Sequence, residues 1–208
     1  GMTLAVDFEE RPAPIRYKLL TAVVIPRPVA GVTTLNPDGS TNAAPYSFFN
    51  VFGQDPALIV LGLQHKADGT AKDTTSNISR TGEFVINIAN EALTGAMVAT
   101  AAAYAPGVSE PEALELALAP SSKIDTPRLA DAPVALECRR VVSLSFSGER
   151  DLLVGEVIGL AARDGLIDTA TWYVDWQGEW PIARLFGENY ARLDEIGAFP
   201  IPPLEGTR

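Results

Sequence analysis

The stretch that decides the fold is residues 29–46, which read VAGVTTLNPDGSTNAAPY. Two runs of β-forming residues flank the turn sequence Asn36-Pro37-Asp38-Gly39. In such a turn the proline presets its own φ, and the glycine adopts a positive φ without steric cost. Residues 29–46 are therefore predicted to form a β-hairpin.

Further strand-length runs lie on both sides of this hairpin. Residues 57–63 and 84–89 are continuous apolar runs of the kind found in buried strands. Residues 133–147 and 152–163 are joined by a polar turn at 148–151, which predicts an antiparallel pair. Residues 21–25, 172–176 and 182–186 favour shorter strands. Many strands in succession with few helices between them indicate a mainly β chain that closes into a barrel.

Three short helices are predicted between the strands. The first spans residues 73–80, with Asp73, Thr74 and Thr75 as capping residue types at its start and Gly82 at its end. The second is alanine-rich and spans residues 90–104. The third lies around residues 113–118, after the capping signature formed by Ser109 and Glu112.

Composition and charge exclude several function classes. The chain has 208 residues and a formal net charge of −10, which repels polyanions and argues against binding to nucleic acid. Its only cysteine is Cys138 and its only histidine is His65, so Cys-rich and multi-histidine metal sites are excluded, and both residues are expected to be structural. No apolar run approaches the ~20 residues that cross a bilayer, and no signal peptide is evident, so a cytoplasmic protein without membrane contact is expected.

Several separated motifs follow one another in a defined order. They are PRPVAGVTT at 26–34, NAAPYSFFN at 42–50, DGTAKDT at 68–74 with Asn77-Ile78, GEFVIN at 82–87, PVALEC at 133–138 and GEV at 155–157. Together they resemble the flavin reductase-like family of FMN-binding split β-barrels over residues 20–190. The resemblance implies a Greek-key split β-barrel with a few short flanking helices, a homodimer, and FMN in a cleft near the subunit interface.

The start of the helix at residue 73 is the candidate phosphate site. The first N–H groups of a helix lack intrahelical acceptors and carry partial positive charge, which favours an anion. Lys72 precedes the helix, Thr74 offers a hydroxyl, and Asp73 and Asn77 belong to the same motif. Further cations that could reach the phosphate are Arg27, Lys66 and Arg80. An ordinary capped surface helix is the alternative for this segment.

The segment Ser47-Phe48-Phe49-Asn50 is the candidate contact for the flavin ring, which needs polar donors along one edge and apolar surface against its face. Ser47 and Asn50 can donate. Phe48 and Phe49 alternate in an extended chain, so one of them is expected to enter the core. The alternative is a polar strand end with core aromatic residues.

Three further candidates complete the predicted FMN site. Thr33 and Thr34 are taken as a pair, because alternation along a strand is expected to turn only one of them inward. Tyr190 follows Arg184-Leu185-Phe186-Gly187, which resembles a family segment near the flavin but has Phe186-Gly187 where a double glycine is usual. His65-Lys66-Ala67 likewise replaces a common Arg-Pro. Both departures leave the specificity for nicotinamide or substrate open.

The leading functional hypothesis is an FMN-binding oxidoreductase that uses NAD(P)H to reduce flavin, or an acceptor through bound FMN. Such hydride transfer asks the protein mainly for stacking geometry and electrostatic tuning, so no catalytic side chain and no metal are assigned. One alternative is an FMN-binding electron carrier that serves a protein partner without NAD(P)H, and another is a split-barrel dimer without redox activity. We expect an N-terminal extension at 1–19, the flavin reductase-like domain at 20–190, and a Pro-rich arm at 191–208 on the surface or across a partner subunit.

Overall fold

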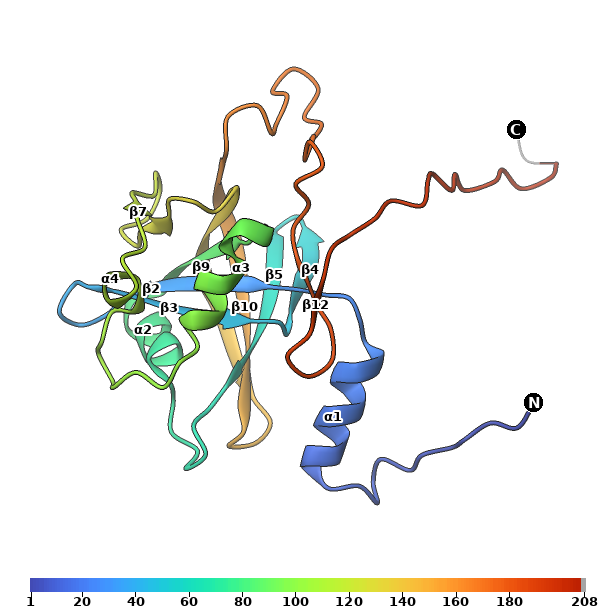
Figure 1. Ribbon diagram of the computed structural model, residues 1–208, viewed down its shortest axis with the longest axis horizontal. Coiled ribbons are helices and arrows are strands. Elements are labelled where there is room, and N and C mark those ends of the chain that lie inside the picture. Colours follow the sequence, from blue (N-terminus) through green and yellow to red (C-terminus); the bar gives the residue numbers. More distant parts are fainter. Residues whose placement is uncertain (207–208) are drawn as a thin grey trace.

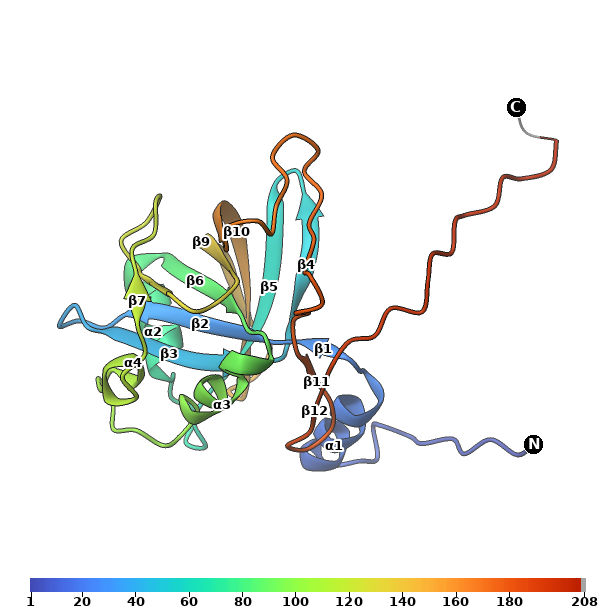
Figure 2. The ribbon, with the colours of Figure 1, turned by 45° about the horizontal axis from the view of Figure 1, so that its top comes forward.

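A seven-stranded antiparallel sheet dominates the computed structural model, which describes residues 1–206. The strand order is β3-β2-β6-β9-β10-β5-β4 (Figure 1). The bounds are β2 Ala30–Leu35, β3 Thr41–Tyr46, β4 Phe49–Gln54, β5 Ala57–Gln64, β6 Glu83–Ile88, β9 Val134–Ser145 and β10 Arg150–Ala162. In Figure 2, β2 and β3 run across the direction of β4 and β5, so the sheet curls around its core. The expected mainly β architecture with a few short helices is confirmed.

The predicted hairpin is β2 and β3, in which Thr34 pairs with Asn42 and Leu35 with Thr41. Gly39 has a φ of 86°, as its turn requires. The expected antiparallel pair is β9 and β10, two long strands that pair from Val134 with Ala162 to Ser145 with Asp151, with two register shifts along β10. These strands form because their inward-facing residues fill one core.

That core joins residues from six strands and one helix of the described chain. Alternate positions of β5 point into it, which explains why Ile59, Leu61 and Leu63 are fully buried. Phe84 and Cys138 meet them from β6 and β9. Burial raises the pKa of the Cys138 thiol to about 12, so this residue is a small apolar core side chain, as expected.

Three helices lie close to their predicted positions. Helix α2 spans Asp73–Thr81 and ends at Gly82, whose φ of 71° is left-handed. Its N-cap is Lys72, so the capping role expected for Asp73, Thr74 and Thr75 is wrong: these residues form the first turn. Helix α3, Glu91–Ala99, is capped by the Asn90 side chain and stops before the predicted 104. Helix α4, Glu110–Ala113, begins at the Ser109 cap and lies before most of the predicted range. The end of that range, Leu118–Ala119, is instead a short strand, β7, which pairs with β8, Arg128–Leu129.

The strand expected at 21–25 is wrong, because Thr21 to Val23 form the last turn of helix α1, Ala13–Val23. Pro14 starts the helix at a position where its missing N–H costs nothing. At the other end, the Arg27 guanidinium donates to the carbonyls of Thr21 (2.6 Å) and Val24 (3.0 Å). The Arg27 side chain, just beyond the end of the helix, thus satisfies helix-end carbonyls, and the helix forms despite the local β preference.

The C-terminal quarter adds little regular structure. Strand β11, Ala183–Arg184, is shorter than the run predicted at 182–186, and it joins β1, Arg27–Pro28, and β12, Tyr190–Ala191, in a small sheet. The strand predicted at 172–176 is absent from the described residues apart from one bridge between Ile167 and Val174, because Trp172 takes a φ of 64°. Beyond Ala191 the described chain leads away from the barrel (Figures 1 and 2).

Within residues 1–206 no helix combines the length and apolarity that a membrane crossing needs. The same residues contain no group of three or more His, Cys, Asp or Glu side chains placed to hold a metal ion.

Candidate functional site

Two connected hollows open beside the start of α2. The first, called the helix-start hollow, has a volume of about 380 Å³. The second, called the aromatic hollow, has a volume of about 220 Å³. Both are lined by Pro45, Tyr46, Lys72 and Ala101, so they form one depression that runs from α2 along the end of β3.

The helix-start hollow offers positive charge and free donors. Lys66 and Lys72 both line it and are exposed. The N–H of Ser76 is the first in α2 to reach a helical carbonyl, that of Lys72, so the three N–H groups before it have no intrahelical acceptor. Asp73 is turned away from them, because its Oδ2 accepts from the Gly107 N–H at 2.8 Å. This end of the depression suits an anion.

A buried polar network forms the floor of the helix-start hollow. The Glu110 carboxylate accepts from the Ala43 N–H at 2.9 Å, and the Asn42 amide lies between Glu110 and the Thr74 hydroxyl. With its nitrogen donating to Glu110 Oε1 (3.0 Å) and its oxygen accepting from Thr74 (3.1 Å), Asn42 satisfies both neighbours. Burial, and then the nearby Asp73 charge, raise the pKa of Glu110. Thr74 is therefore tied into the floor of the hollow.

Tyr46 has a hydroxyl that the fold buries without a well-formed hydrogen bond among the described residues. Burial raises the pKa of Tyr46 to about 12, against a smaller lowering effect of the adjacent Thr74. A buried hydroxyl without a partner costs about 1–3 kcal/mol. Tyr46 lines both hollows, but its hydroxyl is buried below their surface, so the groups that fit an oxygen-rich anion such as a flavin phosphate are the two lysines and the free N–H groups of α2.

The aromatic hollow has flat walls and cationic edges. The Arg150 guanidinium lies 4.1 Å from the centre of the Phe48 ring, in a cation–π contact, and the Tyr17 ring is 6.2 Å from the same ring. Gly62 permits this packing, because a Cβ there would lie 2.9 Å from the Cβ of Phe48. Ser47 stands at the edge of the hollow. Flat apolar walls with a polar edge suit a planar ring system.

Arg27 lines neither hollow. Its guanidinium is buried and donates to the carbonyls of Thr21, Val24 and Leu185 and to Ser47 Oγ at 3.4 Å. Burial, followed by the nearby charge of Arg184, lowers the pKa of Arg27. Arg27 thus ties the end of α1 to the C-terminal segment and touches the site only through Ser47.

Thr33, Thr34 and Asn77 line neither hollow. Thr33 and Thr34 leave opposite faces of β2, as the alternation predicted, and both side chains are fully buried because both faces of the strand are covered. Thr33 donates to the Pro127 carbonyl at 2.7 Å. Asn77 donates to Thr34 Oγ1 at 3.1 Å, which fastens α2 to the sheet.

Three other predicted residues also lie outside the two hollows. Phe49 packs against the core and Phe48 lines the aromatic hollow, so the predicted alternation of this pair is confirmed. Asn50 is exposed on β4, and its Oδ1 accepts from the Val51 N–H. Tyr190 lies next to Arg184, and its hydroxyl accepts from Nη1 of Arg184 at 3.1 Å.

Sequence reasoning missed Tyr17, Tyr46 and Arg150. Tyr46 carried a local signal, since it directly precedes Ser47 at the end of a strand. Tyr17 and Arg150 carried none, because a helix before the barrel and a distant hairpin turn reach this site only in three dimensions. His65 remains a loop residue, with Nδ1 3.0 Å from the Gly148 carbonyl oxygen and Nε2 3.2 Å from Asp151 Oδ2.

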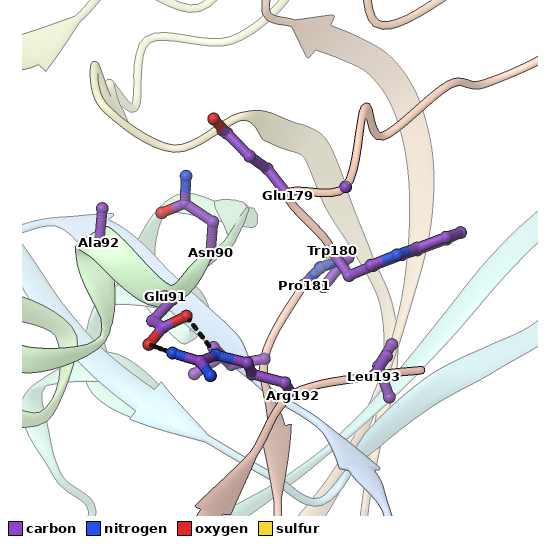
Figure 3. A pocket seen from close by; sticks show the side chains of 10 residues that line it. Asn90, Glu91, Ala92, Glu179, Trp180, Pro181, Arg192 and Leu193 are labelled. Atoms are coloured by element: carbon purple, nitrogen blue, oxygen red, sulfur yellow. Dashed lines mark hydrogen bonds and ion pairs between the residues drawn. The ribbon is translucent and has the colours of Figure 1, made fainter. Parts of the chain in front are cut away.

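A third hollow, of about 470 Å³, lies at the start of α3 beside the C-terminal segment (Figure 3). Its charged groups are already paired, because the Glu91 carboxylate accepts two hydrogen bonds from the Arg192 guanidinium. The Asn90 amide oxygen caps α3 by accepting from the Leu93 N–H. None of the predicted site residues lines this hollow.

Comparison with known proteins identifies the family of this chain. The sequence model of the flavin reductase-like domain matches residues 22–181. The 2-nitrobenzoate 2-nitroreductase NbaA of Pseudomonas fluorescens superimposes with a TM-score of 0.87 at 36% identity over 98% of this chain and 100% of its own. Component B of the nitrilotriacetate monooxygenase of Bacillus cereus superimposes with a TM-score of 0.90 at 36% identity, over 96% and 100% of the two chains.

A third solved structure, a split barrel domain protein of Shewanella frigidimarina NCIMB 400, matches with a TM-score of 0.82 at 20% identity over 97% of this chain and 100% of its own. At that identity it supports the fold alone. Because the family model covers most of the barrel and both 36% relatives match over nearly their full lengths, the chain belongs to the flavin reductase-like family and has its split β-barrel fold.

Proposed function

We propose that this protein is an FMN-binding oxidoreductase that uses NAD(P)H to reduce flavin, or to reduce an acceptor through bound FMN. The observation that carries the proposal is the depression beside α2, where two lysines line the hollow at the helix start and the first N–H groups of the helix lack intrahelical acceptors. The names of the two 36% relatives, a nitroreductase and a monooxygenase component, support oxidation-reduction.

The described residues divide into two groups toward this cofactor. Lys66, Lys72 and the first N–H groups of α2 would hold the phosphate, because they bring charge and free donors to one end of the depression. Ser47 and Phe48 would meet the ring, at the edge and wall of the aromatic hollow. Bound FMN would supply the two-electron redox chemistry, and the protein would supply position, exclusion of water and local charge.

The direct test is to mix purified protein with FMN and with NADH or NADPH, and to follow both flavin fluorescence and nucleotide absorption. We expect the fluorescence of FMN to be quenched on binding and nucleotide oxidation to be accelerated. Flavin binding without nucleotide oxidation would contradict the reductase proposal and favour the electron-carrier alternative. Failure to bind FMN would contradict both.

Changing Tyr46→Phe is expected to raise the free energy of unfolding of the ligand-free protein by about 1 kcal/mol, because the variant no longer buries a hydroxyl without a well-formed hydrogen bond. FMN affinity should stay within about twofold of the wild type, since the hydroxyl is buried below the surface of the depression. Denaturant unfolding and FMN titration measure the two effects, and a loss of stability in the ligand-free variant would show that the hydroxyl is already satisfied.

We further propose a homodimer. The described chain exposes 13051 Å², whereas a compact monomer of this mass, 22.1 kDa, exposes about 9,300 Å². Part of the excess is the extended C-terminal segment, and part is apolar surface on the barrel. Phe52 on the edge strand β4 is 67% exposed, and Phe146, beyond the end of β9, is 80% exposed. An apolar edge strand of this kind is normally covered by a partner.

Light scattering during size-exclusion chromatography is therefore expected to give twice the chain mass. Changing Phe52→Glu together with Phe146→Glu should shift the protein to the monomer, since two charges would be buried at the interface. The control is Gln54→Glu, which adds a charge to an exposed polar position of the same strand. A wild-type protein that elutes as a monomer at micromolar concentration would contradict this proposal.

A further inference from the structure

The aromatic hollow collects positive charge without any matching acid. Lys72, Arg150 and Arg184 line it, and none of its lining residues in the described chain is an aspartate or glutamate. The buried Arg27 guanidinium stands next to it, bonded to Ser47. This is notable in a chain whose formal net charge is −10, where a cation finds acidic neighbours easily.

Among the arginines that line the aromatic hollow, Arg184 is the one whose hydrogen-bond partners in the described chain are all neutral. Its Nη1 donates to the Tyr190 hydroxyl at 3.1 Å and its Nη2 donates to the Gly187 carbonyl at 2.6 Å. Its Nε is buried and has no hydrogen-bond partner among the described residues. Arg150 differs in this respect, because Glu149 Oε1 lies 3.6 Å from its Nη2.

The neighbouring Arg27 adds a second positive charge, whose repulsion makes the unneutralised charge of Arg184 less favourable. All four groups that accept from Arg27 are neutral, and the charge of Arg184 helps to lower the pKa of Arg27. Two neighbouring guanidinium groups without an acid between them repel each other, and a bound anion would relieve that repulsion.

The phosphate of FMN is not placed to meet this need. Its proposed position is the helix-start hollow, which Lys66 and Lys72 line and which Arg150 and Arg184 do not. With the flavin ring proposed against Ser47 and Phe48, the Tyr17 ring and the apolar Val29 are the walls left to a second ligand, and they select the shape of an anion. A flat, aromatic anion fits these walls better than a small inorganic one.

We propose that the aromatic hollow binds the carboxylate of an aromatic acid beside the flavin, with Arg184 as its counter-ion. This assignment rests on the proposed function for the position of the flavin, and it names the substrate class of the same site as aromatic carboxylates. The carboxylate supplies acceptors for the guanidinium, and the ring of the acid stacks on the exposed face of the flavin ring, beside Tyr17.

The test uses benzoate and its neutral counterpart benzamide, titrated into FMN-loaded protein while the flavin absorption spectrum is followed. We expect benzoate to bind at least tenfold more tightly than benzamide. Arg184→Gln should remove that preference and leave benzamide within about twofold, because only the carboxylate uses the charge. The matched control is Arg192→Gln, which changes an exposed arginine and is expected to keep the preference.

Three outcomes would overturn the inference. Equal binding of benzoate and benzamide would show that the charge does not select an anion. A preference for benzoate that survives in Arg184→Gln would assign the counter-ion elsewhere. A lowered flavin reduction potential in Arg184→Gln without any change in benzoate affinity would mean that the charge serves the reduced flavin instead.

The design also separates this inference from the proposed function. If the protein fails to bind FMN, the proposed function fails, and benzoate binding to the ligand-free protein is then measured by calorimetry. In that case, a preference for benzoate that is lost in Arg184→Gln would still support the anion site, and the absence of any preference for benzoate would contradict the site. Circular dichroism of each variant confirms that the barrel is folded.

Discussion

FMN binding is expected to weaken by about 100-fold in the double variant Lys66→Ala with Lys72→Ala, while riboflavin binding stays within about twofold of the wild type. Both ammonium groups line the hollow at the start of α2, where the phosphate is proposed to lie. Each charge-assisted contact contributes about 1.5 kcal/mol or more, and about 1.4 kcal/mol corresponds to a factor of ten. Riboflavin has no phosphate and so does not use these contacts. Fluorescence quenching measures both affinities.

Lys123→Ala is the control for this experiment, because Lys123 is an exposed lysine that lines neither hollow. It should leave both affinities unchanged. An equal loss of FMN and riboflavin binding in the double variant would mean that the lysines support the ring or the fold. In that case the phosphate does not lie at the start of α2.

Arg27→Met is expected to lower the free energy of unfolding of the ligand-free protein by about 3 kcal/mol. The change leaves the carbonyls of Thr21, Val24 and Leu185 without their donor, and each is a hydrogen bond to a charged group. The loss is smaller than the sum of these bonds because burial and Arg184 already oppose the charge, as the lowered pKa of Arg27 shows. Denaturant unfolding measures the difference.

Arg192→Met provides the comparison for Arg27→Met. Its ion pair with Glu91 has shorter contacts, yet both side chains are largely exposed, so its loss is expected to change stability little. Limited proteolysis adds a local readout, because release of α1 in Arg27→Met should expose residues 13–25 to cleavage. Similar stability losses in the two variants would contradict the structural role given to Arg27.

Most of the barrel was predictable because its signals are local. The hairpin of β2 and β3 follows from one turn sequence, and the β9 and β10 pair from two long runs around a polar turn. Helix α2 was predicted to begin at Asp73, directly after the observed Lys72 cap, and Gly82 marked its end. In each case the residues that specify the element lie within it.

The strand predicted at 21–25 failed for the opposite reason. Thr-Ala-Val-Val-Ile has β-forming side chains, but Thr21 lies in the last turn of a helix, where its carbonyl accepts from Arg27, which also donates to the carbonyl of the distant Leu185. The run at 172–176 failed because a left-handed Trp172 interrupts it. Local propensity is a weak preference that such contacts override.

The sequence by itself determined the family, the antiparallel barrel and three residues that line the depression, namely Ser47, Phe48 and Lys72. It could do so because ordered motifs and short-range periodicity are local features of the chain. Only the tertiary structure decided which polar residues face the depression. It set Thr34 against Asn77 of α2 and Thr33 against Pro127 on the other face of β2, and it brought in Tyr17 and Arg150 from distant segments. The physical reason is that burial and charge pairing depend on what packs against a residue, and in a curled sheet that neighbour is usually far away in the chain.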